Sequence, residues 1–413
     1  MPTSTPASSP LCDRLRELAQ IFGRLGCLGF GGPQAHIAMQ NDEAVVRRQW
    51  LTQEQFSDGL AICEMLPGPA STQMGIYLGY IRAGQLGALV AGLAFIAPAL
   101  VIVVALSWAY FRFQALPQLD ALFFGIAPVM IAIILGFCWK LGKKSIRDWP
   151  GVAIAIAVGL AVGWGRLNPL VAFLWAGGVG LVLYRPRRSA DTPQALGVPL
   201  MLTTLPLTTP STDVLALSSF WGWERLREYG WPLVTLFVKT GTFIFGGGLV
   251  IIPLLEYEVV DHLQWLTRSE FINGIAIGQL SPGPVVLTAA FIGFKVAGVL
   301  GALVASIGVF APSFLFIMAG APVLLRIRQN AWVQAFLKAV RPAVVGAIAA
   351  ASLPLMQTAI LAQADAGLTA IAAAIGLLAL VALLRFQVPT WQLVLGGGGL
   401  GWLTGFVFRS YFA

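Results

Sequence analysis

The stretch LGFGGPQAH, Leu28–His36, interrupts an apolar segment near the start of the chain with two adjacent glycines and a proline. A second stretch, FIFGGGLVI at Phe243–Ile251, places the same Phe-Gly-Gly break in a later apolar segment. Glycine and proline are poor residues for a helix interior, because glycine is conformationally free and proline lacks an N–H. The pattern therefore predicts a helix that ends inside an apolar region, and it occurs twice.

The two breaks belong to a tandem repeat. A shift of 215 residues superposes the Phe-Gly-Gly motifs and holds without a gap through the following Pro-Gly-Pro motif. After the loss of one residue the match continues at a shift of 214. The matched motifs are WLT at 50–52 and 265–267, PGP at 67–69 and 282–284, and YLGYIRAGQLGAL at 77–89 with FIGFKVAGVLGAL at 291–303. We expect two duplicated halves, 11–184 and 230–411, joined by a Pro-, Thr- and Ser-rich linker at 185–229.

The composition is that of a membrane protein. Of the 413 residues, 57% are hydrophobic and only 11% are charged, with a mean hydropathy of +0.80. Soluble proteins have about 25% charged residues. Uncharged apolar runs at 87–110, 298–325 and 366–384 each reach the length of about 20 residues that a helix needs to cross a bilayer. The sequence predicts an all-α, multi-pass protein whose partner is the lipid bilayer.

Each half has the same expected layout. An apolar segment ends at Phe-Gly-Gly, two short helices flank Pro-Gly-Pro, and four longer spans follow. The expected ranges are 15–32, 53–66, 70–82, 85–111, 119–140, 151–165 and 168–184, and then 231–248, 268–281, 285–297, 299–325, 331–352, 366–384 and 390–408. The short helices predict a re-entrant hairpin. This gives five crossings per half, about ten in all, and two hairpins.

The charges of equivalent loops predict opposite orientations for the halves. The loop after 119–140 carries four cations, whereas its counterpart near 353–358 carries none. The loop one step earlier reverses this bias, and the stretch after Phe-Gly-Gly is basic in the first half and acidic in the second. The charged residues are Lys140, Lys143, Lys144 and Arg147; Arg112 against Arg326 and Arg328; and Arg47 and Arg48 against Glu256, Glu258 and Asp261. Because basic loops stay in the cytoplasm, we expect inverted-topology repeats, a cytoplasmic linker and both termini outside.

The breaks predict an anion site. Proline suits the first turn of a helix, so helices starting at Pro69 and Pro284 would leave the following N–H groups free inside the membrane. The alternative is that these glycines and prolines serve packing or kinks. The expected substrate-binding residues are Arg24, Gly31, Gly32, Pro67, Gly68, Pro69, Ala70, Ser71, Thr72, Lys239, Gly246, Gly247, Gly248, Ser281, Pro282, Gly283, Pro284 and Arg341. Free N–H groups are expected at Ala70, Ser71 and Thr72 of this set, and also at Val285 and Val286 after the second Pro-Gly-Pro.

A few ionisable residues lie near the breaks. Arg24 and Lys239 occupy equivalent positions and either attract the anion or extend to the membrane interface, and Arg341 has the same two interpretations. Glu64 precedes the first Pro-Gly-Pro, where its counterpart is Gln279. It is a candidate for proton coupling or for a structural hydrogen bond. His36 is either a proton relay or a loop histidine.

Several function classes are excluded. The chain has no GxSxG, HExxH or Walker motif, so neither an enzyme nor a nucleotide-driven pump is indicated. Four scattered cysteines and two histidines have no metal-binding spacing, so no metal or other cofactor is expected. The net charge of +8 fits basic cytoplasmic loops, and nucleic-acid binding is not expected.

The motifs resemble the chromate ion transporter family in its long-chain, two-domain form. The resemblance rests on FGGPQAH, the RRQWL stretch, PGPAST and the second-half SPGP, and it covers nearly the whole chain. It implies a secondary transporter of the bacterial inner membrane that exports chromate, driven by the membrane potential or an ion gradient, and so confers chromate resistance. The alternative is a carrier for another inorganic or organic anion, such as sulfate. Glu64 departs from the neutral glutamine expected there, and a homodimer is left open.

Overall fold

A computed structural model describes residues 10–165, 167–185, 220–244, 247–319, 330–363 and 365–407. Every regular element in these ranges is a helix, which confirms the all-α prediction. Five helical segments are long and apolar enough to cross a membrane: Ala70–Phe113, Pro117–Ser145, Val285–Met318, Ala331–Leu361 and Ala366–Arg385. Most of the expected linker, together with Gly246, Arg326 and Arg328, lies outside the described residues.

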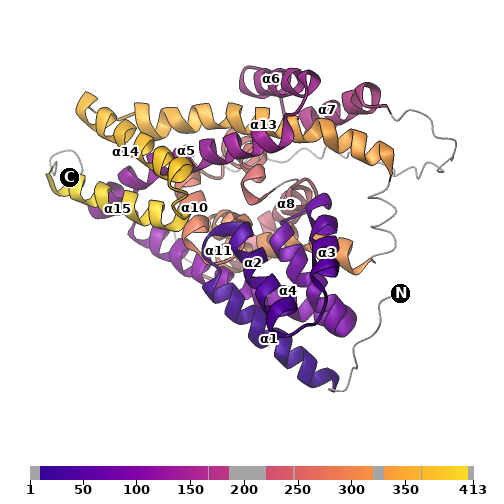
Figure 1. The fold of residues 1–413 in the computed structure, drawn as a ribbon. Helices are drawn as coiled ribbons and strands as arrows, with labels where there is room; N and C mark the ends of the chain where they lie inside the picture. Colours follow the sequence, from indigo (N-terminus) through magenta and orange to yellow (C-terminus); the bar gives the residue numbers. More distant parts are fainter. Residues whose placement is uncertain are drawn as a thin grey trace.

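The first half contains seven α-helices and one π-helical segment within the described ranges (Figure 1). They are α1 (Leu11–Leu28), α2 (Gly32–Asn41), η1 (Asp42–Arg47), α3 (Gln53–Met65), α4 (Ala70–Phe113), α5 (Pro117–Ser145), α6 (Trp149–Gly163) and α7 (Pro169–Leu183). The described part of the second half follows the same order. It consists of α8 (Trp223–Thr242), η2 (Gly248–Ile251), α9 (Ile252–Leu255), η3 (Glu256–His262), α10 (Arg268–Leu280), η4 (Val285–Leu287), α11 (Thr288–Met318), α13 (Ala331–Met356), η5 (Gln357–Leu361), α14 (Ala366–Arg385) and α15 (Thr390–Val407).

Equivalent positions of the two halves share their local geometry. The N-terminus of α3 is closed by a capping box between Thr52 and Gln55, and that of α10 by one between Thr267 and Glu270. The residue before each WLT motif's tryptophan is a glutamine with positive φ, 50° for Gln49 and 52° at the second-half position. The duplicated sequence therefore folds into duplicated local structure.

α4 and α11 are each two helices joined by a sharp turn, at the boundary that the sequence predicts. Ala83 and Gly84 leave helical geometry within α4, and Ala297 and Gly298 do so within α11. The two arms of α4 pack closely, because a Cβ atom built on Gly87 would lie 2.2 Å from the carbonyl oxygen of Gly79. The equivalent glycines of α11 are packed in the same way, because a Cβ atom built on Gly301 would lie 2.1 Å from the carbonyl oxygen of Gly293.

The halves are interlocked. Within each half the first helix packs on the long hairpin, α1 on α4 and α8 on α11. Between the halves, α4 packs on α11. Helices α6 and α7 of the first half pack on α13, and helices α14 and α15 of the second half pack on α5 (Figure 1). The largest cluster of buried apolar side chains draws on both halves. A second cluster consists of first-half residues between Leu18 and Phe95, together with Ile317 of α11.

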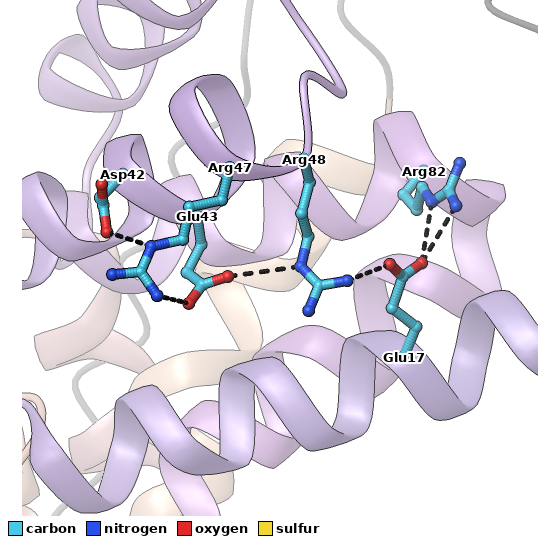
Figure 2. A network of polar contacts seen from close by, with 6 residues as sticks. All are labelled: Glu17, Asp42, Glu43, Arg47, Arg48 and Arg82. Carbon is cyan, nitrogen blue, oxygen red and sulfur yellow. Dashed lines mark hydrogen bonds and ion pairs between the residues drawn. The ribbon is translucent and has the colours of Figure 1, made fainter.

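A network of charges joins the start of α1 to two later turns. Glu17 on α1 pairs with Arg48, which follows η1, at 2.5 Å and with Arg82 near the turn of α4 at 3.0 Å (Figure 2). The guanidinium of Arg14 also donates to the Arg82 carbonyl oxygen at 3.1 Å. The start of α1, the end of η1 and the turn of α4 thus lie at one level of the molecule.

We expect Gly87→Ala to lower the free energy of unfolding by about 1–3 kcal/mol, because the added methyl group overlaps backbone that cannot move aside. Thermal unfolding of the purified protein in detergent would measure this. Gly178→Ala on α7 is the matched control, since a Cβ atom there meets nothing within 4 Å. Equal stability of the two variants would contradict the close packing of the α4 arms.

Candidate functional site

The breaks of the two halves meet in reciprocal pairs. The Gly68 N–H donates to the carbonyl oxygen of Ile244 at 2.7 Å, and the Gly283 N–H donates to that of Gly29 at 3.1 Å. A shift of 215 residues converts one bond into the other. Each Pro-Gly-Pro turn is therefore bound to the Phe-Gly-Gly region of the opposite half, and the structure brings together the motifs on which the predicted site rests.

Both Pro-Gly-Pro turns require glycine. Gly68 has φ +132°, and a Cβ atom on it would lie 2.3 Å from the Ser313 hydroxyl oxygen. Gly283 has φ +119°, and its Cβ atom would lie 2.7 Å from that of Ala99. Ser313 and Ala99 are equivalent residues on α11 and α4. Each turn is thus pressed against the long hairpin of the other half.

Polar side chains surround the first turn of α4. We call His36, Gln40, Ser71, Thr72 and Gln73 the polar cluster; all five are at most 1% exposed. The His36 ring donates from Nε2 to the Gly29 carbonyl oxygen at 2.6 Å, and its Nδ1 lies 3.4 Å from the Ser71 hydroxyl. Because a carbonyl oxygen only accepts, Nε2 must carry the proton, and the neutral ring then accepts from Ser71.

The two glutamines of the cluster are oriented by backbone carbonyls. Gln40 donates from Nε2 to the Ser71 carbonyl oxygen at 3.0 Å. Gln73 donates from Nε2 to the Pro67 carbonyl oxygen at 2.6 Å, and the same nitrogen lies 3.5 Å from the Ser313 hydroxyl. These contacts fix which end of each amide is nitrogen.

Three atoms of the polar cluster are buried without a hydrogen-bond partner among the described residues: Gln40 Oε1, Thr72 Oγ1 and Gln73 Oε1. Buried polar atoms nearly always have a partner in protein or ordered water. Three exceptions around the first turn of α4 leave hydrogen-bonding capacity unused there.

Among the residues that the structure describes, the second half has no such cluster. The positions equivalent to His36 and Gln40 are Ile251 and Leu255, and those near the first turn are Val286 and Leu287; all four are buried. A short 3₁₀ turn, η4, stands where the first half begins α4. The side-chain surroundings of the two Pro-Gly-Pro turns therefore differ, and the polar side chains gather at the first-half turn.

The expected backbone donors are also fewer. The Thr72 N–H donates to the Pro69 carbonyl oxygen at 2.9 Å, so it is not free as expected. Ala70 and Ser71, the first residues of α4, retain N–H groups without an intrahelical acceptor. The hydroxyl of Ser281 donates to the Gly278 carbonyl oxygen at 2.9 Å, so it caps α10 rather than facing a ligand.

The other predicted site residues lie as follows. Pro69, Pro282 and Pro284 are buried, Pro67 is half-buried, and Gly31 and Gly32 have positive φ at the start of α2. Gly247 faces the ring of Phe137, and Gly248 is buried against η4. Gly246 lies outside the described residues.

The expected cations are not part of the polar cluster. Lys239 pairs with Glu258 at 2.5 Å, and Glu258 is buried and also accepts from Asn168 at 3.3 Å. This pairing neutralises Lys239. Arg24 on α1 and Arg341 on α13 are exposed. Within the described ranges, no arginine or lysine is hydrogen-bonded to the cluster.

The two short helices before the Pro-Gly-Pro turns differ in burial. Residues 271–279 of α10 are buried throughout, whereas α3 buries only Phe56, Gly59, Ile62 and Cys63. Gln279 accepts from the Thr390 hydroxyl at 3.2 Å and is 7% exposed. Its counterpart Glu64 is exposed and lies 3.5 Å from Lys144. α10 packs on α5 and α4 of the opposite half as well as on α15, whereas the main packing of α3 within the described ranges is on α4 of its own half.

Charged contacts accompany the docking of α10. Arg268 pairs with Asp261 at 2.5 Å and approaches the buried Glu256 at 3.7 Å. At the equivalent position of the first half, Asn41 donates to the Gln53 side chain at 3.2 Å. Burial, reinforced by Asp261 and opposed by Arg268, raises the pKa of Glu256 to about 8.

The sequence interpretation missed Gln40, Gln73 and Ser313. A signal for all three is present in the repeat alignment, because each is polar where the opposite half has an apolar or smaller counterpart. Positions at which duplicated halves differ in polarity are therefore informative in addition to those that match.

Comparison with known proteins places these features in a family. A family model for the chromate transporter matches residues 16–181 and 231–402. The chain is 33% identical to a chromate transport protein of Cupriavidus metallidurans, over 94% of this chain and 92% of that protein. A chromate transport protein of Pseudomonas aeruginosa is 31% identical over 83% of this chain and 81% of its own. No solved structure matches the chain.

We expect Thr72→Val to raise the free energy of unfolding by roughly 1 kcal/mol, because it removes a buried hydroxyl that has no partner. The matched control is Thr288→Val, whose hydroxyl donates to the Val285 carbonyl oxygen at 3.0 Å and whose loss should lower stability. Melting temperatures of both variants, without added anions, would measure the difference. A loss of stability in Thr72→Val as large as in the control would mean that the hydroxyl has a partner.

Proposed function

The chain belongs to the chromate transporter family, whose members are transport proteins rather than enzymes, and we propose that it exports chromate across a bacterial inner membrane as a secondary transporter. The observation that carries the proposal is the meeting of the broken helices beside the polar cluster. Irregular backbone in a membrane is tolerated where it lines a path or is buried in protein, and transporters hold substrate at such breaks.

Contacts between the halves support inverted topology. Lys338 near the start of α13 pairs with Asp148, just after α5, at 3.1 Å. Further along, Cys138 of α5 contacts the Val345 carbonyl oxygen of α13 at 3.5 Å. The equivalent helices α5 and α13 therefore run antiparallel, as a two-fold axis in the membrane plane requires.

Other contacts support the same arrangement. Asn168, between α6 and α7, bonds to Glu258 of the second half, and Asn273 near the start of α10 donates to Tyr110 near the end of α4 at 3.1 Å. In each case a residue near the end of a first-half helix lies beside a residue in the early part of the second half. The cations after α5 mark their end of the molecule as cytoplasmic.

The first segment of each half is better described as a hairpin than as a crossing. The Glu17 ion pairs hold the start of α1 at the level of Arg48 and Arg82, so α1 and α2–η1 enter and return on one side. We infer two re-entrant hairpins per half, whose tips are Phe-Gly-Gly and Pro-Gly-Pro. This revises the expected ten crossings and puts the start of the first half on the cytoplasmic side.

The expected cytoplasmic linker is also revised. Tyr184 bonds to Asp148 at the cytoplasmic end of α5, whereas the Phe220 carbonyl oxygen accepts from Val299 at the turn of α11. In the inverted arrangement these two flanking residues lie toward opposite faces. Two outside termini and a linker confined to the cytoplasm are therefore not part of the proposal.

The difference between α3 and α10 supports alternating access. α10 packs against the first half and covers the breaks on the side of the second half. On the cytoplasmic side, the exposed Glu64 of α3 lies near Lys144. If the halves exchange conformations, α3 docks on α13 and α7 while α10 is released. Substrate at the breaks would then be exposed to one side at a time.

Chromate uptake into proteoliposomes tests the proposed function. We expect uptake that depends on the protein and is reduced by competing chromate analogues. Thr72→Val should lower uptake at subsaturating chromate about tenfold or more, because a hydrogen bond to a charged group contributes about 1.5–3 kcal/mol. Thr288→Val is the control and should transport normally.

Absence of chromate flux, with flux of sulfate or an organic anion instead, would favour the alternative carrier. Normal chromate flux in Thr72→Val would exclude the first turn of α4 as the binding site while leaving chromate transport in place.

Cross-linking tests alternating access. Pro169 is the first residue of α7 and Pro389 directly precedes α15, the last helix of its half, so the Gln279–Thr390 contact corresponds to a Glu64–Leu170 contact in the exchanged state. We expect Glu64→Cys with Leu170→Cys, in a background without native cysteines, to be joined by a short reagent during turnover, with loss of transport.

The pair Gln279→Cys with Thr390→Cys is the positive control and should be joined at rest. Failure to join positions 64 and 170 during active transport, or full transport by the joined protein, would refute the exchange of the two hairpins.

A further inference from the structure

The polar cluster contains acceptors that a bare dianion cannot satisfy. Both glutamines donate through Nε2 to backbone carbonyl oxygens, which cannot act as donors, so the amides cannot be reversed. Their Oε1 atoms therefore remain acceptors, buried and without partners. The oxygens of a fully ionised oxyanion also only accept, and they would leave these two atoms unsatisfied.

The same place offers donors as well. The Thr72 hydroxyl has no partner, and the N–H groups of Ala70 and Ser71 lie at the start of α4, where the helix dipole favours negative charge. The cluster is thus a mixed set of donors and acceptors. It fits a ligand that carries both acceptor oxygens and an O–H group.

The charge of the cluster points the same way. Lys239 is neutralised by Glu258, and Arg24 and Arg341 are exposed away from any bond with the cluster. The cost of moving an ion out of water rises with the square of its charge, so a dianion needs far more compensation than a monoanion. Helix dipoles and neutral donors supply only partial charge.

We propose that the species bound at the first turn of α4 is hydrogen chromate, the singly charged, protonated form, rather than the chromate dianion. This inference rests on the proposed function. The O–H of the ligand donates to Gln40 or Gln73 Oε1, and its other oxygens accept from Thr72 and the free N–H groups.

The proposal has a consequence for selectivity. Chromate takes up a proton close to neutral pH, whereas sulfate remains a dianion throughout that range. Sulfate would therefore bring a second charge and no donor to a site with two idle acceptors. The cluster would select between two tetrahedral oxyanions of similar shape by protonation.

Binding of chromate to the full-length protein in detergent, measured by equilibrium dialysis across pH values on both sides of neutral, tests the proposal. The apparent Kd for total chromate should rise about tenfold per pH unit once hydrogen chromate has lost its proton, because only the protonated form binds. Perrhenate, a tetrahedral monoanion without an O–H group, serves as the comparison at each pH.

Perrhenate also corrects for the titration of the protein itself. The ionisable groups nearest the first turn of α4 are His36 in the cluster, Glu64 and Lys144 beyond the Pro-Gly-Pro turn, and Arg24 on α1. Because perrhenate keeps one charge over the whole range, any pH dependence of its binding reports these groups. The pH dependence of chromate binding that remains after subtraction of the perrhenate dependence reports the protonation of chromate.

Gln40→Met and Gln73→Met separate the role of the O–H group from that of charge. At acidic pH we expect at least one of them to weaken chromate binding about tenfold while changing perrhenate binding little, since a hydrogen bond of this kind contributes a factor of this size. Thr288→Val should change neither.

The outcomes are distinguishable. Tighter or constant chromate binding as pH rises, after the perrhenate correction, would overturn the proposal, as would equal losses of chromate and perrhenate binding in both glutamine variants. Chromate flux in proteoliposomes together with either result would leave the proposed function standing. Absence of chromate binding and flux at every pH would refute the proposed function itself.

Discussion

The two hydrogen bonds between the Pro-Gly-Pro turns and the opposite Phe-Gly-Gly regions are the constraint on which the rest of the structure depends. A helix that breaks in an apolar surrounding leaves backbone groups without partners, and each such group costs several kcal/mol in hydrocarbon. Here Gly68 and Gly283 find their acceptors in the other half. Each break therefore obtains a backbone acceptor from the opposite half, so the two halves stabilise each other at these turns. The packing of α6 and α7 on α13, and of α14 and α15 on α5, adds further contacts between the halves.

Local signals in the sequence predicted local structure well. The turn of α4 lies at Ala83–Gly84, between the expected ranges 70–82 and 85–111, because the glycine there adopts φ +64°, which other residues avoid. The capping boxes and the prolines after the breaks act in the same way. Contacts between residues some 200 positions apart were not predictable, since periodicity records which face of a helix is apolar but not which helix covers it. The first segment was expected to cross the membrane for this reason; only the Glu17 ion pairs place its start beside Arg82.

The polar cluster could be predicted only in part. His36, Ser71 and Thr72 stand next to the glycine and proline motifs, so a search around the motifs finds them. Gln40 lies one helical turn beyond His36 and reaches the site through the Ser71 carbonyl oxygen, a contact that depends on how α2 returns along α4. Charge was the weaker guide. Lys239 aligned with Arg24 in sequence, yet it is paired with Glu258, because η3 places this acidic side chain beside it.

The two halves of the duplicated scaffold have diverged at the breaks, and this divergence makes their hairpins unequal. Two identical halves around a two-fold axis would present two equal sites and two equally docked hairpins. The first half has instead kept a polar first turn and an undocked α3, while the second has Leu255 and Leu287 and a docked α10. The ion pair between Lys295 and Glu270 joins α10 to α11 within the second half, at positions where the first half has Ile81 and Gln55. In the proposed alternating-access cycle, the energetic difference between the two hairpins would set which face of the molecule is open at rest. Binding at the polar first turn can change this preference only by interacting differently with the docked and undocked states of α3.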